Sequence, residues 1–420
     1  MKISTSFSEI TRAYNAVQAV VADKLLQEDL KTLTIWKNGD KLSIVASNAF
    51  VSALTEFDAE ILADEGEEIA DEVFIQLKAS ELKNIMGTYS GLHLTEITKM
   101  VFDIRSNTEI RLEVYEEAVN KDDEHFDKFK KTIKHRMMRV RVTENMKREI
   151  HNFITNTEVG AGEQMIQLQT AEILGYIEPL LPAIAKFPND TIFSRLFFLS
   201  KYVFIIPQTY AAVIENRMDD DVKAHFSEFV LTTSVTQFLK SFLSLYQTVG
   251  FCKKITGDVV NLIFQTNETT AMVRAYNTKK VPNLEDGYNI QPDNFISLDR
   301  KYFADVLKRI SNSNADVTFR IKITEDGGSS CEIINAALTQ EVPVYKSKGE
   351  GEYLFTLNSD LLASLVFNNM IDCYGDRLVF RLDHNDDGKV NFYVMDNTKG
   401  WHTKMQGLSL TKSDLGIWDK

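Results

Sequence analysis

The amino-acid sequence predicts an α+β protein of three similar domains, each built from two βαβββ units. A short apolar strand followed by an amphipathic helix recurs six times along the chain, and extended segments punctuated by turns follow the helices. The 420 residues exceed what one ordinary hydrophobic core can hold and suit two to four domains. Two units can share a core that one unit alone is too small to stabilise.

The clearest copy of the strand–helix unit is Phe295–Ile310. It begins as a short, mostly apolar strand, Phe295–Leu298. Asp299 then occupies the position of a helix N-cap, where a carboxylate accepts amide hydrogens of the first turn. The predicted helix has an apolar face formed by Tyr302, Phe303, Val306, Leu307 and Ile310. Its remaining surface is positive and carries Arg300, Lys301, Lys308 and Arg309.

The six predicted units begin at Lys2, Val73, Met165, Phe229, Phe295 and Tyr353. In the first unit, Asn38-Gly39-Asp40 separates two alternating segments, which is a strong signal for a β-hairpin. Pairing the units two by two predicts domain 1 at residues 1–150, domain 2 at 164–287 and domain 3 at 288–410. Residues 151–163 are predicted as a linker and 411–420 as a C-terminal tail.

The longest interval between units contains the one irregular segment, Tyr115–Glu163. It holds an acidic run at residues 122–124 and a basic run from Lys128 to Arg148. We interpret Met137–Thr143 as the last strand of domain 1 and the rest as linker or as an insertion at about residues 115–135. The basic run is either a solvated charged loop or a loop that contacts DNA or a partner.

The composition argues against several classes of protein. The net charge is −13, which argues against a wholly basic nucleic-acid-binding surface but permits bases gathered on one inner face. No apolar run is long enough to span a bilayer, and the N-terminus lacks the apolar core of a signal peptide, so we expect a cytoplasmic protein. Cys252, Cys331 and Cys373 are widely spaced and are expected to be reduced structural thiols.

No pattern of catalytic residues stands out. The seven histidines are scattered, without an H-E-x-x-H motif, and no phosphate-binding glycine loop occurs. The acidic segment Asp383–Gly388 lacks the ligand spacing of a calcium loop and is expected to be a hairpin turn. The sequence therefore predicts a protein that is not an enzyme and that holds no cofactor and no metal.

Three segments resemble the bacterial DNA sliding clamp, the beta subunit of DNA polymerase III. They are Lys41–Phe57, similar to a strand pair of its first domain; Thr170–Lys186, similar to the entry helix of its second; and Asp286–Asp293, similar to the linker into its third. The resemblance extends over Met1–Leu410 as a diffuse pattern. It implies clamp domains whose helices line a central channel and whose antiparallel sheets lie outside, in a homodimeric ring that encircles double-stranded DNA. The implied partners are this DNA, a DNA polymerase and a clamp loader. No association with a membrane is implied.

The sequence departs from the family at the peptide-binding cleft. The family's Thr-Asp-Gly-His-Arg stretch corresponds here to Pro207–Ala211, and its final Met-Pro-Met-Arg-Leu strand corresponds to Met405–Leu408 followed by a tail to Lys420. The cleft is therefore expected to have an altered partner preference. These departures suggest a phage-encoded or otherwise divergent clamp, which would act in the host cytoplasm if viral.

The resemblance implies three groups of site residues. DNA-contacting residues of the channel are expected at Arg12, Lys24, Lys83, Lys186, Lys240, Arg300, Lys301, Lys308 and Arg309. The partner cleft is expected at Phe193, Thr209, Tyr210, Ala211, Pro292, Met405, Gln406, Gly407 and Leu408. The subunit interface is expected to join Met100–Tyr115 of one subunit to Ile310, Ser311 and Ala336–Glu341 of the next.

Alternatives remain open at this point. Solvated helix faces would also explain the channel bases, and ordinary core packing would explain part of the cleft. The chain could form a ring of another stoichiometry, or it could be a non-catalytic scaffold that uses clamp-like domains to bind other proteins.

Overall fold

The computed structural model describes residues 1–21, 31–63, 68–89, 97–106, 108–116, 131–160, 163–185, 192–206, 210–278, 293–311, 317–335, 338–357, 376–385, 389–396 and 401–409. The chain forms two compact units. Unit 1 comprises Met1–Thr170 and Gln237–Ala275, and unit 2 comprises Ala171–Thr236 and Tyr276–Lys420. The division into three domains stays a prediction.

Unit 1 opens with a strand, a helix and further strands in the predicted order. Its first half consists of β1 (Lys2–Thr5), α1 (Phe7–Val21), β2 (Thr32–Asn38), β3 (Lys41–Ser47), β4 (Val51–Glu56), β5 (Ala59–Leu62), β6 (Glu72–Lys78), α2 (Ala79–Tyr89), β7 (Ile97–Ile104), β8 (Glu109–Glu116) and β9 (Lys131–Val140). The remainder consists of α3 (Glu144–Thr157), β10 (Ile166–Gln169), most of α6 (Thr233–Leu243), β15 (Thr248–Thr256), β16 (Val259–Gln265) and most of β17 (Thr269–Asn277).

The first nine strands are linked by a continuous series of antiparallel pairings. The order is β5–β1–β7–β8–β9–β6–β2–β3–β4, and β17 pairs with the far side of β4. The predicted hairpin joins β2 to β3, with Gly39 at φ 60° in the first position of its two-residue loop. Glycine favours this position because a Cβ atom disfavours positive φ.

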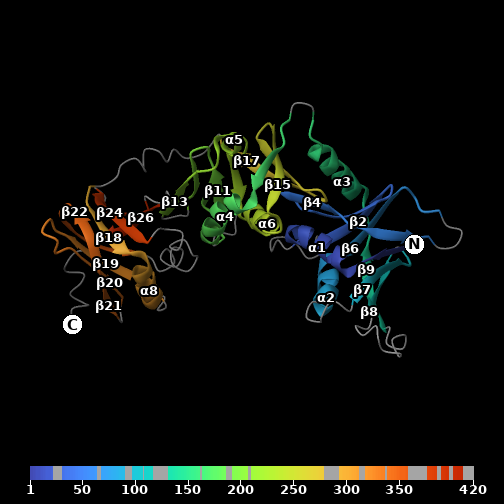
Figure 1. Cartoon of the computed structure of the whole chain (residues 1–420), viewed down its shortest axis with the longest axis horizontal. Coiled ribbons are helices and arrows are strands. Elements are labelled where there is room, and N and C mark those ends of the chain that lie inside the picture. Colours follow the sequence, from blue (N-terminus) through green and yellow to red (C-terminus); the bar gives the residue numbers. More distant parts are fainter. Residues whose placement is uncertain are drawn as a thin grey trace. The chain divides into compact units, whose positions relative to one another are not determined.

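Helices cover both faces of the β2–β4 sheet. α1 packs on β3 and β4 and contacts α2, and Figure 1 shows these two helices on one side of the strands and α3 on the other. The α3 side has its own core, in which Ile150 and Phe153 meet Trp36 of β2. This core also contains Cys252, Ile263 and Met272, from β15, β16 and β17, so α3 spans the seam between β4 and β17.

The helix α3 differs from the sequence interpretation, which placed a strand end, an insertion and a linker here. Thr143 is its N-cap and accepts a hydrogen bond from the Met146 amide at 3.3 Å. Ile150, Phe153 and Thr157 are buried at helical spacing. The charged composition of the segment hid this pattern, because most of the charges lie on the exposed side of the helix.

Unit 2 begins with α4 (from Thr170 to Ile184), the short helix η4 (Ile192–Ser194), β11 (Arg195–Phe198), β12 (Tyr202–Ile205), β13 (Tyr210–Glu215), α5 (Asp220–His225) and β14 (Phe229–Thr232). It continues with β18 (Phe295–Asp299), α8 (Arg300–Ser311), β19 (Val317–Ile323), β20 (Ser330–Ile334), β21 (Thr339–Val342), β22 (Val344–Lys348), β23 (Gly351–Leu357), β24 (Arg377–Asn385), β25 (Lys389–Asp396) and β26 (Trp401–Ser409).

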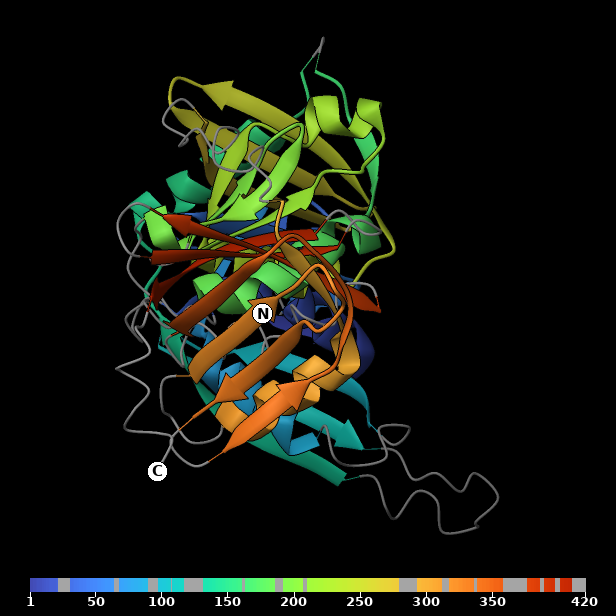
Figure 2. The ribbon, with the colours of Figure 1, turned by 90° about the vertical axis from the view of Figure 1, so that its left-hand side faces the viewer.

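The last nine strands repeat the order of the first nine. Their neighbours run β22–β18–β24–β25–β26–β23–β19–β20–β21, so β18 corresponds to β1 and each later strand to its counterpart. β13 pairs with the far side of β26. In Figure 2 the strands from β18 to β23 are drawn in orange.

Five of the six predicted strand–helix units are confirmed as β1–α1, β6–α2, β10–α4, β14–α6 and β18–α8. The sixth predicted helix, with Leu361 and Leu365, lies outside the described residues. In α8, Phe303, Val306, Leu307 and Ile310 are buried as predicted, but Tyr302 is 38% exposed, and Ala304 is buried instead. No helix among the described residues is long and apolar enough to cross a membrane. Cys252 and Cys331 are buried free thiols.

Candidate nucleic-acid and partner interfaces

The helix α8 presents the densest group of predicted DNA-contacting cations. Lys301, Lys308 and Arg309 are exposed and alternate with the buried apolar face, while Arg300 is half-buried. Asp299 directly before the helix uses its carboxylate to accept the Tyr302 amide at 2.8 Å, as a cap does. Its charge is therefore held at the N-terminus, and the surface of α8 stays positive, with Asp305 as its only acid.

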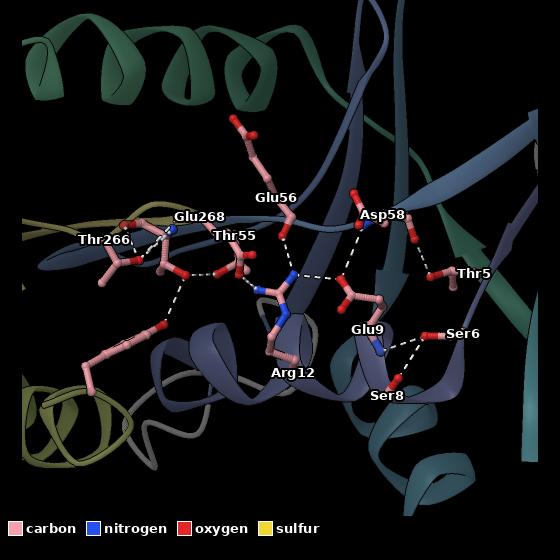
Figure 3. A network of polar contacts seen from close by, with 12 residues as sticks. Thr5, Ser6, Ser8, Glu9, Arg12, Thr55, Glu56, Asp58, Thr266 and Glu268 are labelled. Atoms are coloured by element: carbon pink, nitrogen blue, oxygen red, sulfur yellow. Dashed lines mark hydrogen bonds and ion pairs between the residues drawn. The ribbon is translucent and has the colours of Figure 1, made fainter.

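Arg12 on α1 is held by acidic and backbone oxygens. Its guanidinium bonds Glu9 at 2.7 Å and the Glu56 carbonyl at 3.0 Å, and it forms an ion pair with Glu268. Figure 3 shows it between α1 and the seam of β4 with β17. At this seam the Thr55 and Thr269 hydroxyls meet at 3.0 Å, and both residues are fully buried. A phosphate would have to displace these carboxylates to reach Arg12.

The pKa shifts of Glu9 and Arg12 agree with an ion pair between the two side chains. The hydrogen bond from Arg12 lowers the pKa of Glu9, and burial, which opposes it, is the weaker effect. Burial would lower the pKa of Arg12, but Glu9 and Glu268 together outweigh it and raise that pKa above its usual value. Both groups stay charged at neutral pH.

The other predicted channel residues are on different helices. Lys83 is exposed on α2, and Lys240 is half-buried in the last turn of α6. Lys24 and Lys186 lie outside the described residues. The structure thus places the described cations on helices, as the channel prediction requires, and their contact with DNA stays a prediction.

Two groups of predicted cleft residues, distant in sequence, are neighbours in the sheet. The first residue of β13, Tyr210, pairs with Met405 of β26, and Ala211 pairs with Lys404. Gln406, Gly407 and Leu408 continue β26. Phe193 belongs to η4, and only its backbone is described. Thr209 and Pro292 lie outside the described residues. A hollow of about 370 Å³ lies at the other end of β13, beside Tyr176 and Met218.

Only some of the residues predicted for the subunit interface lie on a strand with an open edge. Met100 is fully buried on β7, which pairs with β1 and β8, and β8 in turn pairs with β9. The described residues of Met100–Tyr115 therefore offer no open strand edge, and the part of this segment in a subunit interface stays a prediction. Ile310 is also fully buried, and of Ser311 only the backbone is described. Glu341, by contrast, is exposed on β21.

The open edge that sequence reasoning missed is β9. Its residues 131–138 pair with β8 on one side, and only its last two residues pair with β6. Among the described residues, no strand occupies the rest of that second side. β21 is open in the same way, since its described partner is β20 alone. Strand order, which is a property of the assembled sheet, was needed to find both edges.

The fold is that of the bacterial DNA sliding clamps. It is similar to Caulobacter crescentus pol III beta, with a TM-score of 0.70, 13% identity, and coverage of 98% of this chain and 100% of that chain. It is also similar to the DNA polymerase III beta subunit of Thermotoga maritima (0.69, 13%, 98% and 100%) and to the DNA polymerase sliding clamp of Bacillus subtilis (0.68, 12%, 98% and 99%). No family model and no curated protein matches the sequence.

Proposed function

We propose that this protein is a DNA sliding clamp, a ring-shaped processivity factor that encircles duplex DNA and tethers the replicative DNA polymerase. It performs no chemistry of its own and acts in the cytoplasm, which is the host's if the chain is phage-encoded. Its similarity to sliding clamps over nearly the whole length of both chains supports the proposal.

The observation that carries the proposal is a pair of unfilled strand edges. The first nine strands and the last nine have the same order, so β4 corresponds to β21 and β9 to β26. β4 is covered by β17, and β26 is covered by β13. Among the described residues, β21 and β9 have no such covering strand. A second copy of the chain would supply both, with β21 of one copy beside β9 of the other.

Exposed apolar side chains support this closure. Met138 on β9 is 60% exposed, and Leu338, next to β21, is 42% exposed. Burying such residues in a head-to-tail contact would favour association. Because each copy offers one edge of each kind, two copies can close a ring, which is the homodimer that we propose.

The contacts with DNA would be sequence-independent and weak. Lys83 and the α8 cations would meet phosphates through a screened attraction, which allows movement along the duplex. The strand pair of Tyr210 and Met405 would form part of the cleft for the polymerase and for a clamp loader.

Retention on circular DNA tests the function. Protein assembled on a nicked circular plasmid is washed at about 1 M salt, where the screening length falls to about 3 Å and phosphate contacts are weak. We expect it to stay on the circle and to leave after the plasmid is cut once. Equal loss from circular and linear DNA would contradict a clamp and favour the scaffold alternative.

A further inference from the structure

The sheet of β22, β18 and β24 carries a cation–aromatic face, which we define as Phe295, Tyr345, Lys346, Lys348, Arg377 and Arg381. The strand register places Phe295 opposite Lys348 on one side and Arg381 on the other. Ser297 is opposite Lys346 in the same way. Residues directly opposite each other in neighbouring strands share a face of the sheet.

This face lies opposite α8. The alternating residues Ile296, Leu298 and Phe380 are fully buried, and Phe380 packs edge-on against Phe303 of α8 with 4.8 Å between ring centroids. Since successive side chains of a strand point to opposite sides, the cation–aromatic face is on the far side of the sheet from the helix. It is therefore distinct from the α8 cations of the proposed channel.

Cations and rings are stacked on one another here. The Arg377 guanidinium lies 3.5 Å from the centroid of the Tyr345 ring, and that of Arg381 lies 5.4 Å from the centroid of Phe295. Tyr345 is 56% exposed. Lys346 and Lys348 are exposed, and no acidic partner is found for them among the described residues. The face thus offers planar stacking surfaces beside positive charges.

The equivalent face of unit 1 provides an internal comparison. β1 pairs with β5 and β7 just as β18 pairs with β22 and β24. Lys2 takes the place of Phe295 and is opposite Leu62 and Asp103. Ser4 takes the place of Ser297 and is opposite Glu60 and Val101. The same fold position therefore holds one cation with two acids and lacks aromatic residues at these places. The acid of the cation–aromatic face is Asp299, opposite Arg377, and its carboxylate caps α8. The cation–aromatic face is not a consequence of the fold.

We propose that the cation–aromatic face binds single-stranded nucleic acid. Single strands expose both phosphates and base planes, and proteins that bind them without sequence preference combine basic surfaces with aromatic stacking. A duplex hides its base planes, so Tyr345 and Phe295 would gain nothing from it. An acidic peptide would match the charges but would leave the rings without a stacking partner.

The test measures binding of a fluorescent oligothymidylate of about 20 nucleotides, longer than the ~4–16 nucleotides that a single-strand site covers. We expect Tyr345→Ala to weaken binding about tenfold through lost stacking. Lys346→Glu with Lys348→Glu is expected to weaken it at least as much and to reduce its salt dependence. Lys2→Glu with Lys99→Glu, which makes the same change of charge on the equivalent face of unit 1, should leave binding unchanged.

Two comparisons separate this site from the proposed channel and from simple charge attraction. Lys308→Glu with Arg309→Glu on α8 should leave oligothymidylate binding intact, whatever its effect on retention of duplex DNA. Polyglutamate should compete poorly. Equal loss of binding in the α8 variant, or competition by polyglutamate as strong as that of the oligonucleotide, would overturn the proposal.

Discussion

The seam between β4 and β17 depends on a few polar side chains. Arg12 bonds Glu9 and Glu268, and Thr55 bonds Thr269. The Glu56 amide also donates to the Glu268 carbonyl at 2.8 Å. Because charge-assisted bonds between partly buried groups are stronger than those on an open surface, Arg12 has a structural role that its position on a helix does not reveal.

Arg12→Ala should lower the free energy of unfolding by about 1 kcal/mol, since its partners remain partly accessible to water. Lys41→Ala is the control, because Lys41 makes an exposed ion pair with Glu56 at 2.8 Å and should cost less than about 0.5 kcal/mol. Urea denaturation followed by circular dichroism measures both. An equal loss in the two variants would contradict a special role for Arg12.

The same pair predicts a dependence on pH. The pKa of Glu9 is lowered in the folded protein, chiefly by Arg12, from its usual 4.5. A group of this kind contributes stability above its unfolded pKa, and that contribution is lost as the pH falls through the lowered, folded pKa. The stability difference between the wild type and Glu9→Gln should therefore be constant near neutral pH and shrink below pH 4.5. A difference that grows on acidification would contradict this assignment.

The resemblance to sliding clamps implied a DNA contact for Arg12, because helices line the channel in that family and Arg12 lies on a predicted helix. Its partner Glu268 is far along the chain and could be found only after β4 and β17 were seen to pair. By contrast, the Asp299 cap was predictable because a cap and its helix are adjacent in sequence. Local polar contacts can be read from a sequence, whereas long-range ones depend on the assembled sheet.

Among the elements, α3 explains why β2 is buried on both faces. Leu33 and Ile35 are buried on the α1 side, and Thr34 and Trp36 are buried on the other. The Trp36 indole donates to Glu72 at 3.0 Å, and Glu72 also bonds His151 of α3 at 2.7 Å. A sheet exposed on one side would alternate apolar and polar residues, so the burial of both faces indicates a covering element.

Phe153→Ala in α3 should lower the free energy of unfolding of unit 1 by about 3 kcal/mol, because it leaves a cavity under the helix. Asn152→Ala, one position away on the exposed side, is the matched control and should be close to neutral. Chemical denaturation measures both variants. If α3 were a dispensable linker, Phe153→Ala would be as neutral as its control.

The cations of α8 can be tested as a group. Lys308→Glu with Arg309→Glu should weaken the binding of a short linear duplex at low salt, because the reversed charges repel phosphates. The control, Lys147→Glu with Arg148→Glu, makes the same change of charge on α3, on the other side of the β2–β4 sheet from α1. Its binding to the linear duplex should match that of the wild type. Equal effects of the two variants would mean that net charge, and not the surface of α8, controls binding.

For the whole molecule, the repeated strand order links the fold to the proposed assembly. The six-unit pattern predicted the strands and most helices, because it rests on hydrophobic periodicity within short segments. It did not predict which edges stay open, since Met100–Tyr115 carries the pattern of any sheet strand. Comparing β4 with β21 and β26 with β9 identified the edges. β4 and β26 each have a covering strand, whereas β21 and β9 have none among the residues that the structure describes.

The solution mass should report the closure of these edges. One chain has a mass of 47.9 kDa, and at micromolar concentration we expect the mass of two chains by light scattering. Met138→Asp with Leu338→Asp should shift the protein to one chain, because a charge would be buried at the contact. Ile255→Asp is the control, since Ile255 is 63% exposed on β15 and outside the two edges. Dissociation of the control to the same extent would contradict the proposed edges.

Covalent closure of the ring around DNA tests the central proposal most directly. In a chain with Cys373→Ser, Lys134→Cys on β9 and Thr339→Cys on β21 would place thiols on the two edges, while the native Cys252 and Cys331 are buried. Chains are assembled with nicked circular DNA, oxidised and then denatured with detergent. We predict protein that stays linked to the circle after denaturation and is released by one double-strand cut. Efficient cross-linking into a two-chain species that detergent frees from intact circles would contradict the encircling of DNA.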